Sequence, residues 1–159
     1  MTTESLTLDR VAPGDTLPDL PVDVDVTAVV LGALASRDWR PMHHDKDFAV
    51  ERNGTRHIFM NTPHNAAYFE RYITDWTGPK GRLGRIQFRM KDSVFPGDRM
   101  VFHGEVKDVG TDAAGCGWVD LALRLSVGAK TTTECSARVA LPTSPDDNPW
   151  KRKGDQWLP

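Results

Sequence analysis

The chain has 159 residues, of which 39% are hydrophobic and 26% charged, and its formal net charge is −2 at pH 7. This length and composition predict one soluble globular domain and exclude an intrinsically disordered chain. A near-neutral charge without a basic block argues against nucleic acid as a partner, and no apolar run approaches the ~20 residues of a membrane span. Met1–Arg10 carries no secretory signal, so we expect a cytoplasmic protein in which Cys116 and Cys135 are reduced packing residues.

The N-terminal part of the chain is expected to contain a lead-in, a strand and a helix, in that order. Residues 1–21 are polar and turn-rich, with several prolines, which favours an extended lead-in. Val22–Val26 alternates apolar and acidic residues and predicts a short strand. Thr27 is then expected to cap a helix over Ala28–Ser36, and the polar stretch Arg37–Asp47 to form a loop.

A second helix is marked more clearly, by signals at both of its ends. Thr62 can cap it, and Pro63 suits the first helical position, where a missing N–H has no intrahelical acceptor to lose. Gly78 followed by Pro79 is a stop signal. The pattern predicts a helix over Pro63–Thr77. Apolar residues recur along it at helical spacing and form one broad face: Ala66, Phe69, Tyr72, Ile73 and Trp76.

After this helix, apolar residues recur at every second position, which predicts β-strands. We expect four of them, over Arg85–Lys91, Arg99–Asp108, Val119–Val127 and Thr133–Leu141. Short connections and polar outer faces indicate an antiparallel meander, with the apolar helix upstream covering its inner face. A curved antiparallel sheet wrapped around a central helix is the hot-dog arrangement. The expected fold class is therefore α+β, a single hot-dog domain over residues 1–159.

The C-terminal segment 142–159 is charged and contains prolines, with Trp150 and Trp157 embedded in it. Chain ends commonly fray, which favours a solvated, partly ordered tail. The alternative is that the two tryptophans pack against a partner subunit.

A carboxylate and an imidazole five positions apart form the most unusual cluster in the sequence, Asp38-Trp39-Arg40-Pro41-Met42-His43. Pro41 fixes its own φ and biases Arg40 away from the helical conformation, so the segment bends. The bend can bring Asp38 and His43 onto one water molecule. The carboxylate can accept the proton of that water, while the imidazole positions the water or shuttles the proton. Addition of water to a polarised double bond needs such a pair.

The start of the second helix can supply a donor for the negative charge that develops on a carbonyl oxygen. Amides of the first turn have no intrahelical acceptor, and the helix dipole places partial positive charge there. Pro63 lacks an N–H, which leaves the amides of His64 or Asn65 and the side chain of Asn61 as candidate donors. Together with Thr62, these residues are the substrate-binding candidates at a thioester.

Each of these features has a plainer alternative. Asp38 alone would be a turn residue, and His43 alone a loop histidine. Adjacent histidines rarely converge on one ion, so no metal site is predicted. Downstream, Lys80, Arg82 and Arg85 could meet the phosphates of a CoA carrier, or they could form a solvated basic loop.

Several stretches of the sequence resemble the MaoC-like (R)-specific enoyl-CoA hydratases, which are hot-dog proteins. The cluster from Asp38 to His43 is similar to their Asp-x-Asn-Pro-x-His signature, and Pro96-Gly97-Asp98 is similar to the turn between their sheet strands. Three further stretches are similar to the small MaoC-like subunit of actinobacterial steroid side-chain enoyl-CoA hydratases: His43–Asp47, Ile58–Asn61 and Arg71–Pro79.

The resemblance implies roles for these residues. Asp38 and His43 would activate water, and the start of the second helix would hold the thioester carbonyl. The resemblance also implies an acyl-CoA substrate, no cofactor other than the CoA that the substrate carries, and a homodimer or a heteromer with a second MaoC-like subunit. Arg40 departs from the pattern, because hydratases commonly have asparagine at this position.

The expected function is therefore hydration of a 2,3-enoyl-CoA to a 3-hydroxyacyl-CoA, in lipid or steroid side-chain catabolism. One alternative is a thioesterase on the same fold, which typically carries its carboxylate on the central helix, where Glu70 and Asp75 are the candidates. The other is a non-catalytic, acyl-CoA-binding partner subunit of a heteromeric hydratase, against which the intact pair of Asp38 and His43 argues.

Overall fold

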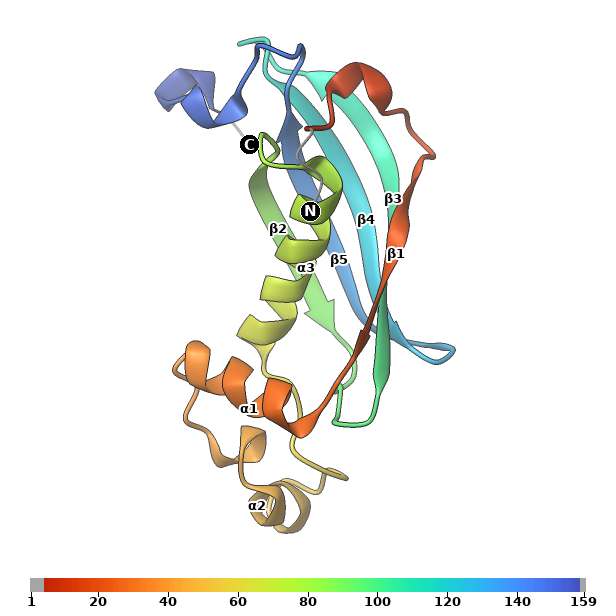
Figure 1. Cartoon of the computed structure of the whole chain (residues 1–159), viewed down its shortest axis with the longest axis vertical. Helices are drawn as coiled ribbons and strands as arrows, with labels where there is room; N and C mark the ends of the chain where they lie inside the picture. The colour runs from red at the N-terminus through yellow and green to blue at the C-terminus, as the bar shows by residue number, and fades with distance from the viewer. Residues whose placement is uncertain (1–4, 158–159) are drawn as a thin grey trace.

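A long helix packs along one face of a curved sheet in the computed structural model, which describes residues 5–157 (Figure 1). Within these residues the sheet has five strands: β1 (Thr16–Asp23), β2 (Arg82–Met90), β3 (Arg99–Thr111), β4 (Gly117–Val127) and β5 (Lys130–Leu141). The helices are α1 (Val26–Ala35), α2 (Lys46–Glu51) and the long α3 (Thr62–Thr77). Short 3-10 turns lie at Leu8–Arg10, Pro41–His43, Pro149–Lys151 and Gly154–Gln156. None of the helices in the described part of the chain is long and apolar enough to cross a membrane.

The strand order is β1-β3-β4-β5-β2, and all neighbouring pairs are antiparallel. The predicted meander is therefore wrong at its first strand, since β2 pairs with β5 and not with β3. In that pairing Ile86 lies opposite Ala137 and Phe88 opposite Cys135, which places β2 at the edge of the sheet remote from β1. The period of a strand shows which of its residues share a face, but it does not specify a distant partner strand. The α+β class and the wrapped central helix agree with the prediction.

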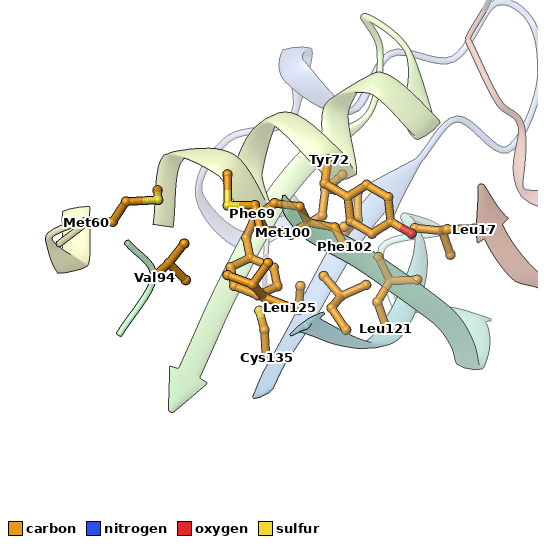
Figure 2. Close-up of a cluster of buried hydrophobic side chains, with 14 of the residues drawn as sticks. Leu17, Met60, Phe69, Tyr72, Val94, Met100, Phe102, Leu121, Leu125 and Cys135 are labelled. Carbon is orange, nitrogen blue, oxygen red and sulfur yellow. The ribbon is translucent and has the colours of Figure 1, made fainter. Parts of the chain in front are cut away.

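The core lies between α3 and the inner face of the sheet (Figure 2). Phe69 of α3 is fully buried, and its ring meets that of Phe102 in β3 edge to face, with 5.0 Å between centroids. Tyr72 and Ile73 extend the same helical face, as the helical period predicted. Both cysteines are free and buried, which fits the packing role predicted for them. Burial raises the pKa of the Cys135 thiol to about 12, so this thiol stays protonated.

The N-terminal region departs from the sequence predictions in three places. β1 runs over Thr16–Asp23 and not over the predicted Val22–Val26, so residues 16–21 of the expected lead-in are strand and Val26 already begins α1. The N-cap of α1 is Asp25 and not Thr27, because the Asp25 carboxylate accepts the Ala28 amide hydrogen at 2.6 Å. α2 was not predicted, since a helix of six residues is too short to show a helical period.

Both ends of the described chain pack near the C-terminal end of α3. The Leu6 amide donates to the Thr77 carbonyl at 2.9 Å, and the Trp150 indole N–H donates to the Gly81 carbonyl at 3.1 Å. The tail is therefore in contact with its own domain through Trp150, which nevertheless stays 57% exposed. Contact of the two tryptophans with a partner subunit stays a prediction.

Candidate active site

The segment between α1 and α2 reverses direction in two tight steps. The Asp38 amide donates to the Ala33 carbonyl at 2.9 Å, which folds the chain back on the end of α1. Arg37, at this reversal, has a left-handed backbone with φ 54°. Pro41 then begins a 3-10 turn that ends at His43. The bend predicted from the proline is therefore present.

Asp38 and His43 lie side by side, with 3.4 Å between Oδ2 of the carboxylate and Nε2 of the imidazole. The other ring nitrogen of His43, Nδ1, is 2.8 Å from the Phe59 carbonyl oxygen. Because a carbonyl only accepts, Nδ1 carries the hydrogen, and Nε2 holds the lone pair of the neutral ring. His43 is buried at 2% exposure, whereas the Asp38 side chain is 10% exposed. The structure thus brings together the carboxylate and imidazole that the sequence singled out.

Asn61 connects this pair to α3. Its Nδ2 donates to Ser36 Oγ at 2.8 Å and to Asp38 Oδ2 at 3.1 Å. Its Oδ1 accepts the His64 amide hydrogen at 3.1 Å, so Asn61 is the N-cap of α3. The prediction of a Thr62 cap is wrong. The Asn61 side chain uses its donors on its own chain, so it orients Asp38 and the helix start relative to each other.

The first-turn amides of α3 differ in their availability. The His64 amide is occupied by the Asn61 side chain, and the Asn65 amide donates to the Asn61 carbonyl at 3.2 Å. The Thr62 amide has no hydrogen-bond acceptor within residues 5–157, and Thr62 is exposed. Among the donors at the helix start, the Thr62 amide is therefore the one open to a ligand, in place of the His64 and Asn65 amides that the sequence suggested.

Two residues that support the site, Ser36 through Asn61 and Phe59 through His43, were not among the residues that the sequence singled out. Ser36 accepts from Asn61 and donates from its hydroxyl to the Gly32 carbonyl at 2.8 Å. Phe59 supplies the carbonyl that holds His43, and its ring meets the imidazole edge to face at 4.9 Å between centroids. A serine at a helix end is a recognisable capping signal, but the position of a main-chain carbonyl leaves no mark in the residue type.

Arg40 compensates the charge of Asp38. Its Nε donates to Oδ1 at 2.8 Å and a terminal nitrogen donates to Oδ2 at 2.9 Å, which is a bidentate pair. These bonds, together with the hydrogen bond from Asn61 and the nearby His43, hold the pKa of Asp38 well below its usual range, against the opposing effect of burial. Asp38 is therefore an ionised acceptor at neutral pH.

The basic residues predicted to meet CoA phosphates lie near the other end of α3 (Figure 1). The helix has 16 residues, which corresponds to about 24 Å. Lys80 donates to a carbonyl of the C-terminal tail, and Arg82 donates to two tail carbonyls at 3.0 and 3.1 Å. Arg85 is exposed on β2. The structure does not gather these three residues with the pair, and their contact with CoA stays a prediction.

Comparison with known proteins identifies the family. No family model matches the sequence. Over 96 residues, or 60% of this chain, the sequence is 38% identical to the 3-oxo-4,17-pregnadiene-20-carboxyl-CoA hydratase beta subunit of Mycobacterium tuberculosis, and the match covers 74% of that protein. The chain belongs to the MaoC-like hydratase family.

Solved structures extend the likeness beyond the matched sequence. The ChsH1-ChsH2 complex from Mycobacterium tuberculosis contains a chain that is 29% identical to this MaoC-like chain. Their TM-score is 0.75, over 82% of this chain and 98% of that one. The unliganded R-hydratase PhaJ1 from Pseudomonas aeruginosa has a TM-score of 0.77 at 18% identity, over 88% of each chain. The second likeness concerns the fold alone, and it confirms the hot-dog architecture.

Proposed function

We propose that this MaoC-like chain is the catalytic subunit of an enoyl-CoA hydratase. The enzyme would add water reversibly across the 2,3-double bond of an enoyl-CoA thioester and give a 3-hydroxyacyl-CoA. The observation that carries the proposal is the pairing of an ionised Asp38 with Nε2 of His43 at 3.4 Å. A partner subunit without a catalytic role would have no need for this arrangement.

The hydrogen-bonding state of the pair suits one water molecule. Asp38 is an acceptor, and a neutral His43 presents the lone pair of Nε2, because its Nδ1 donates to the Phe59 carbonyl. Two acceptors cannot bond to each other, but a water molecule can donate one hydrogen to each of them. The lone pairs of that water are then left for an electrophilic carbon of the substrate.

In the proposed reaction, the oxygen of this water attacks C3 while one of its protons passes to the pair. A C3–O bond forms, the π bond between C2 and C3 breaks, and its electrons move to the thioester oxygen as an enolate. The pair then gives the proton to C2, so both parts of the water are in the product and the enzyme is unchanged. The Thr62 amide, at the positive end of α3, is the candidate donor to the enolate oxygen. No electrons leave the substrate, so the proposal needs no cofactor besides the CoA that the substrate carries.

A second MaoC-like subunit is the partner that we propose. The similar solved chain is part of the two-component ChsH1-ChsH2 complex. Large apolar side chains of α1 and the adjoining loop are exposed in the isolated chain, among them Leu31 at 57%, Leu34 at 44% and Trp39 at 64%. A partner surface or a hydrophobic acyl group would bury them. By analogy with the named relative, we propose a steroid or other lipid acyl group.

The thioesterase alternative is less well supported. Its carboxylate would have to come from α3, where Glu70 is exposed and Asp75 accepts a hydrogen bond from Arg71 at 3.3 Å. Both residues lie beyond the first turn, away from the open Thr62 amide. Neither is therefore placed to act on a thioester at the helix start.

The test is an assay of the chain purified from its native host with any bound partner, using short-chain and steroid enoyl-CoA substrates. We expect loss of the enoyl absorbance and formation of 3-hydroxyacyl-CoA. Release of free CoA without loss of the enoyl absorbance would instead identify a thioesterase. A preparation that is inactive with every partner would identify a binding subunit.

A further inference from the structure

Arg40 covers the solvent side of the proposed catalytic carboxylate. Both carboxylate oxygens of Asp38 accept from its guanidinium, at 2.8 and 2.9 Å. The Arg40 side chain is 63% exposed, whereas that of Asp38 is only 10% exposed. His43 and Asn61 contact the same carboxylate through their own side chains, and both of these residues are buried. The carboxylate is therefore held in one plane between an exposed cation and a buried imidazole.

The charges around Asp38 balance only when Arg40 is present. Within residues 5–157, Arg40 and His43 are the charged or titratable side chains in contact with Asp38, and Asn61 is its neutral contact. Without Arg40, Nε2 of His43 would lie 3.4 Å from an uncompensated carboxylate, which favours a proton on the ring. An imidazolium would donate directly to Asp38, and Nε2 could no longer accept from a water molecule.

We propose that Arg40 is a positioning residue for the hydration. It fixes the plane of the Asp38 carboxylate and balances its charge, so that His43 stays neutral and the pair can bind water. This inference rests on the proposed function, since it gives Arg40 a part in that reaction. It also implies that this chain works at lower pH than it would with the asparagine of the hydratase signature. Lysine at this position would keep the positive charge but lose the two parallel hydrogen bonds. Glutamine would lose the charge and the two parallel hydrogen bonds.

The first test is an NMR titration of His43 in the full chain with labelled imidazole nitrogens. The His43 signals are assigned by their absence in His43→Gln. We expect Arg40→Gln to move the His43 titration midpoint to higher pH by about one unit or more, and Arg40→Lys to move it less. Arg37→Gln is the matched control, because Arg37 is an exposed arginine of the same loop. Its removal should change the midpoint by no more than about 0.2 unit, since solvent and salt screen an exposed charge.

The pH dependence of kcat in the assembled enzyme gives a second readout. The acidic limb should move to higher pH in Arg40→Gln by the same amount as the NMR midpoint, while KM stays unchanged. An unchanged midpoint overturns the proposal, and so does a lower kcat with the wild-type pH profile. If Arg40→Gln does not fold, Arg40→Asn, which also removes the charge, decides in the same way. If the wild-type assembly shows no hydration, the proposed function fails, but the NMR titration still decides whether Arg40 balances the pair.

Discussion

The two ends of α3 lie beside different parts of the chain, α1 and α2 at the N-terminal end and the tail at the C-terminal end (Figure 1), and they use charged residues in opposite ways. At the N-terminal end, Asn61 meets Asp38 of the α1–α2 segment, and the ionised Asp38 carboxylate lies 3.4 Å from an imidazole nitrogen of His43 in the same segment. At the C-terminal end, Arg82 donates to two carbonyls of the tail and lies 3.7 Å from the centre of the Trp157 ring. Both ends looked functional in the sequence. The difference shows that a charged residue indicates a binding or catalytic site only where its neighbours leave it able to form a further hydrogen bond with a ligand.

The largest effect is expected from removal of the pair at the N-terminal end. Asp38→Asn and His43→Ala should each lower kcat for hydration by ~10²–10⁴-fold, as is typical when a general acid–base group is lost. Circular dichroism should show that both variants keep the fold. His44→Ala is the matched control, because His44 is exposed next to the buried histidine, and it should keep wild-type turnover. Wild-type turnover in Asp38→Asn or in His43→Ala would contradict the proposed acid–base role of these two residues.

Asn61→Ala should cause the largest loss of stability. The variant loses the cap of α3 and leaves Ser36 and Asp38 without a buried donor, which together should lower the free energy of unfolding by about 2–3 kcal/mol. Urea unfolding measures the change. Asn148→Ala is the comparison at the other end, since Asn148 caps only a short tail turn through the Trp150 amide. Asn148→Ala should lower the free energy of unfolding by about 0.5 kcal/mol. Equal losses in the two variants would contradict the proposed difference between the two ends of α3.

Arg82→Gln tests whether the C-terminal end binds CoA. The change removes two hydrogen bonds and two cation–π contacts to the tail, so the free energy of unfolding should fall by about 1 kcal/mol. Hydrogen exchange should show faster exchange over residues 149–157. KM for the acyl-CoA should stay within about twofold, because the tail already occupies this guanidinium. A tenfold rise in KM would instead support the phosphate contact predicted from the sequence.

The smallest effect is expected in the acid stability of the folded chain. The pKa of Asp38 is lowered from 3.8 on folding, so the stability that its ionised form contributes is present above that value and is lost as the pH falls below it. The difference in free energy of unfolding between wild type and Asp38→Asn should therefore shrink as the pH is lowered from about 5 toward about 3. The effect is small because Arg40 is exposed and solvent screens the pair. A difference that grows toward acid would contradict the lowered pKa.

Local patterns predicted much of this molecule. The period of apolar residues located α3, with Phe69 and Ile73 in the core, because a helix face repeats within one segment. Pro41 predicted the bend that places Asp38 beside His43, since proline restricts the backbone around it. The pairing of β2 with β5 joins segments about fifty residues apart, and no short pattern encodes it.

The remaining differences come from competition between neighbouring residues. Both Asn61 and Thr62 can cap a helix, and the choice depends on whether the side chain also has partners in the folded chain, as Asn61 has in Ser36 and Asp38. In the same way, Arg40 could have extended into solvent. Its two bonds to Asp38 depend on the direction in which the loop turns, which the residue types alone do not give.

The Phe59 carbonyl that holds the His43 ring belongs to the main chain. An exchange of the side chain at residue 59 would reshape the wall beside the imidazole without deleting this oxygen. The backbone conformation between α2 and α3 therefore fixes which ring nitrogen of His43 carries the hydrogen. Substitution of the aromatic group would therefore change the surroundings of the imidazole, while the hydrogen remains on Nδ1.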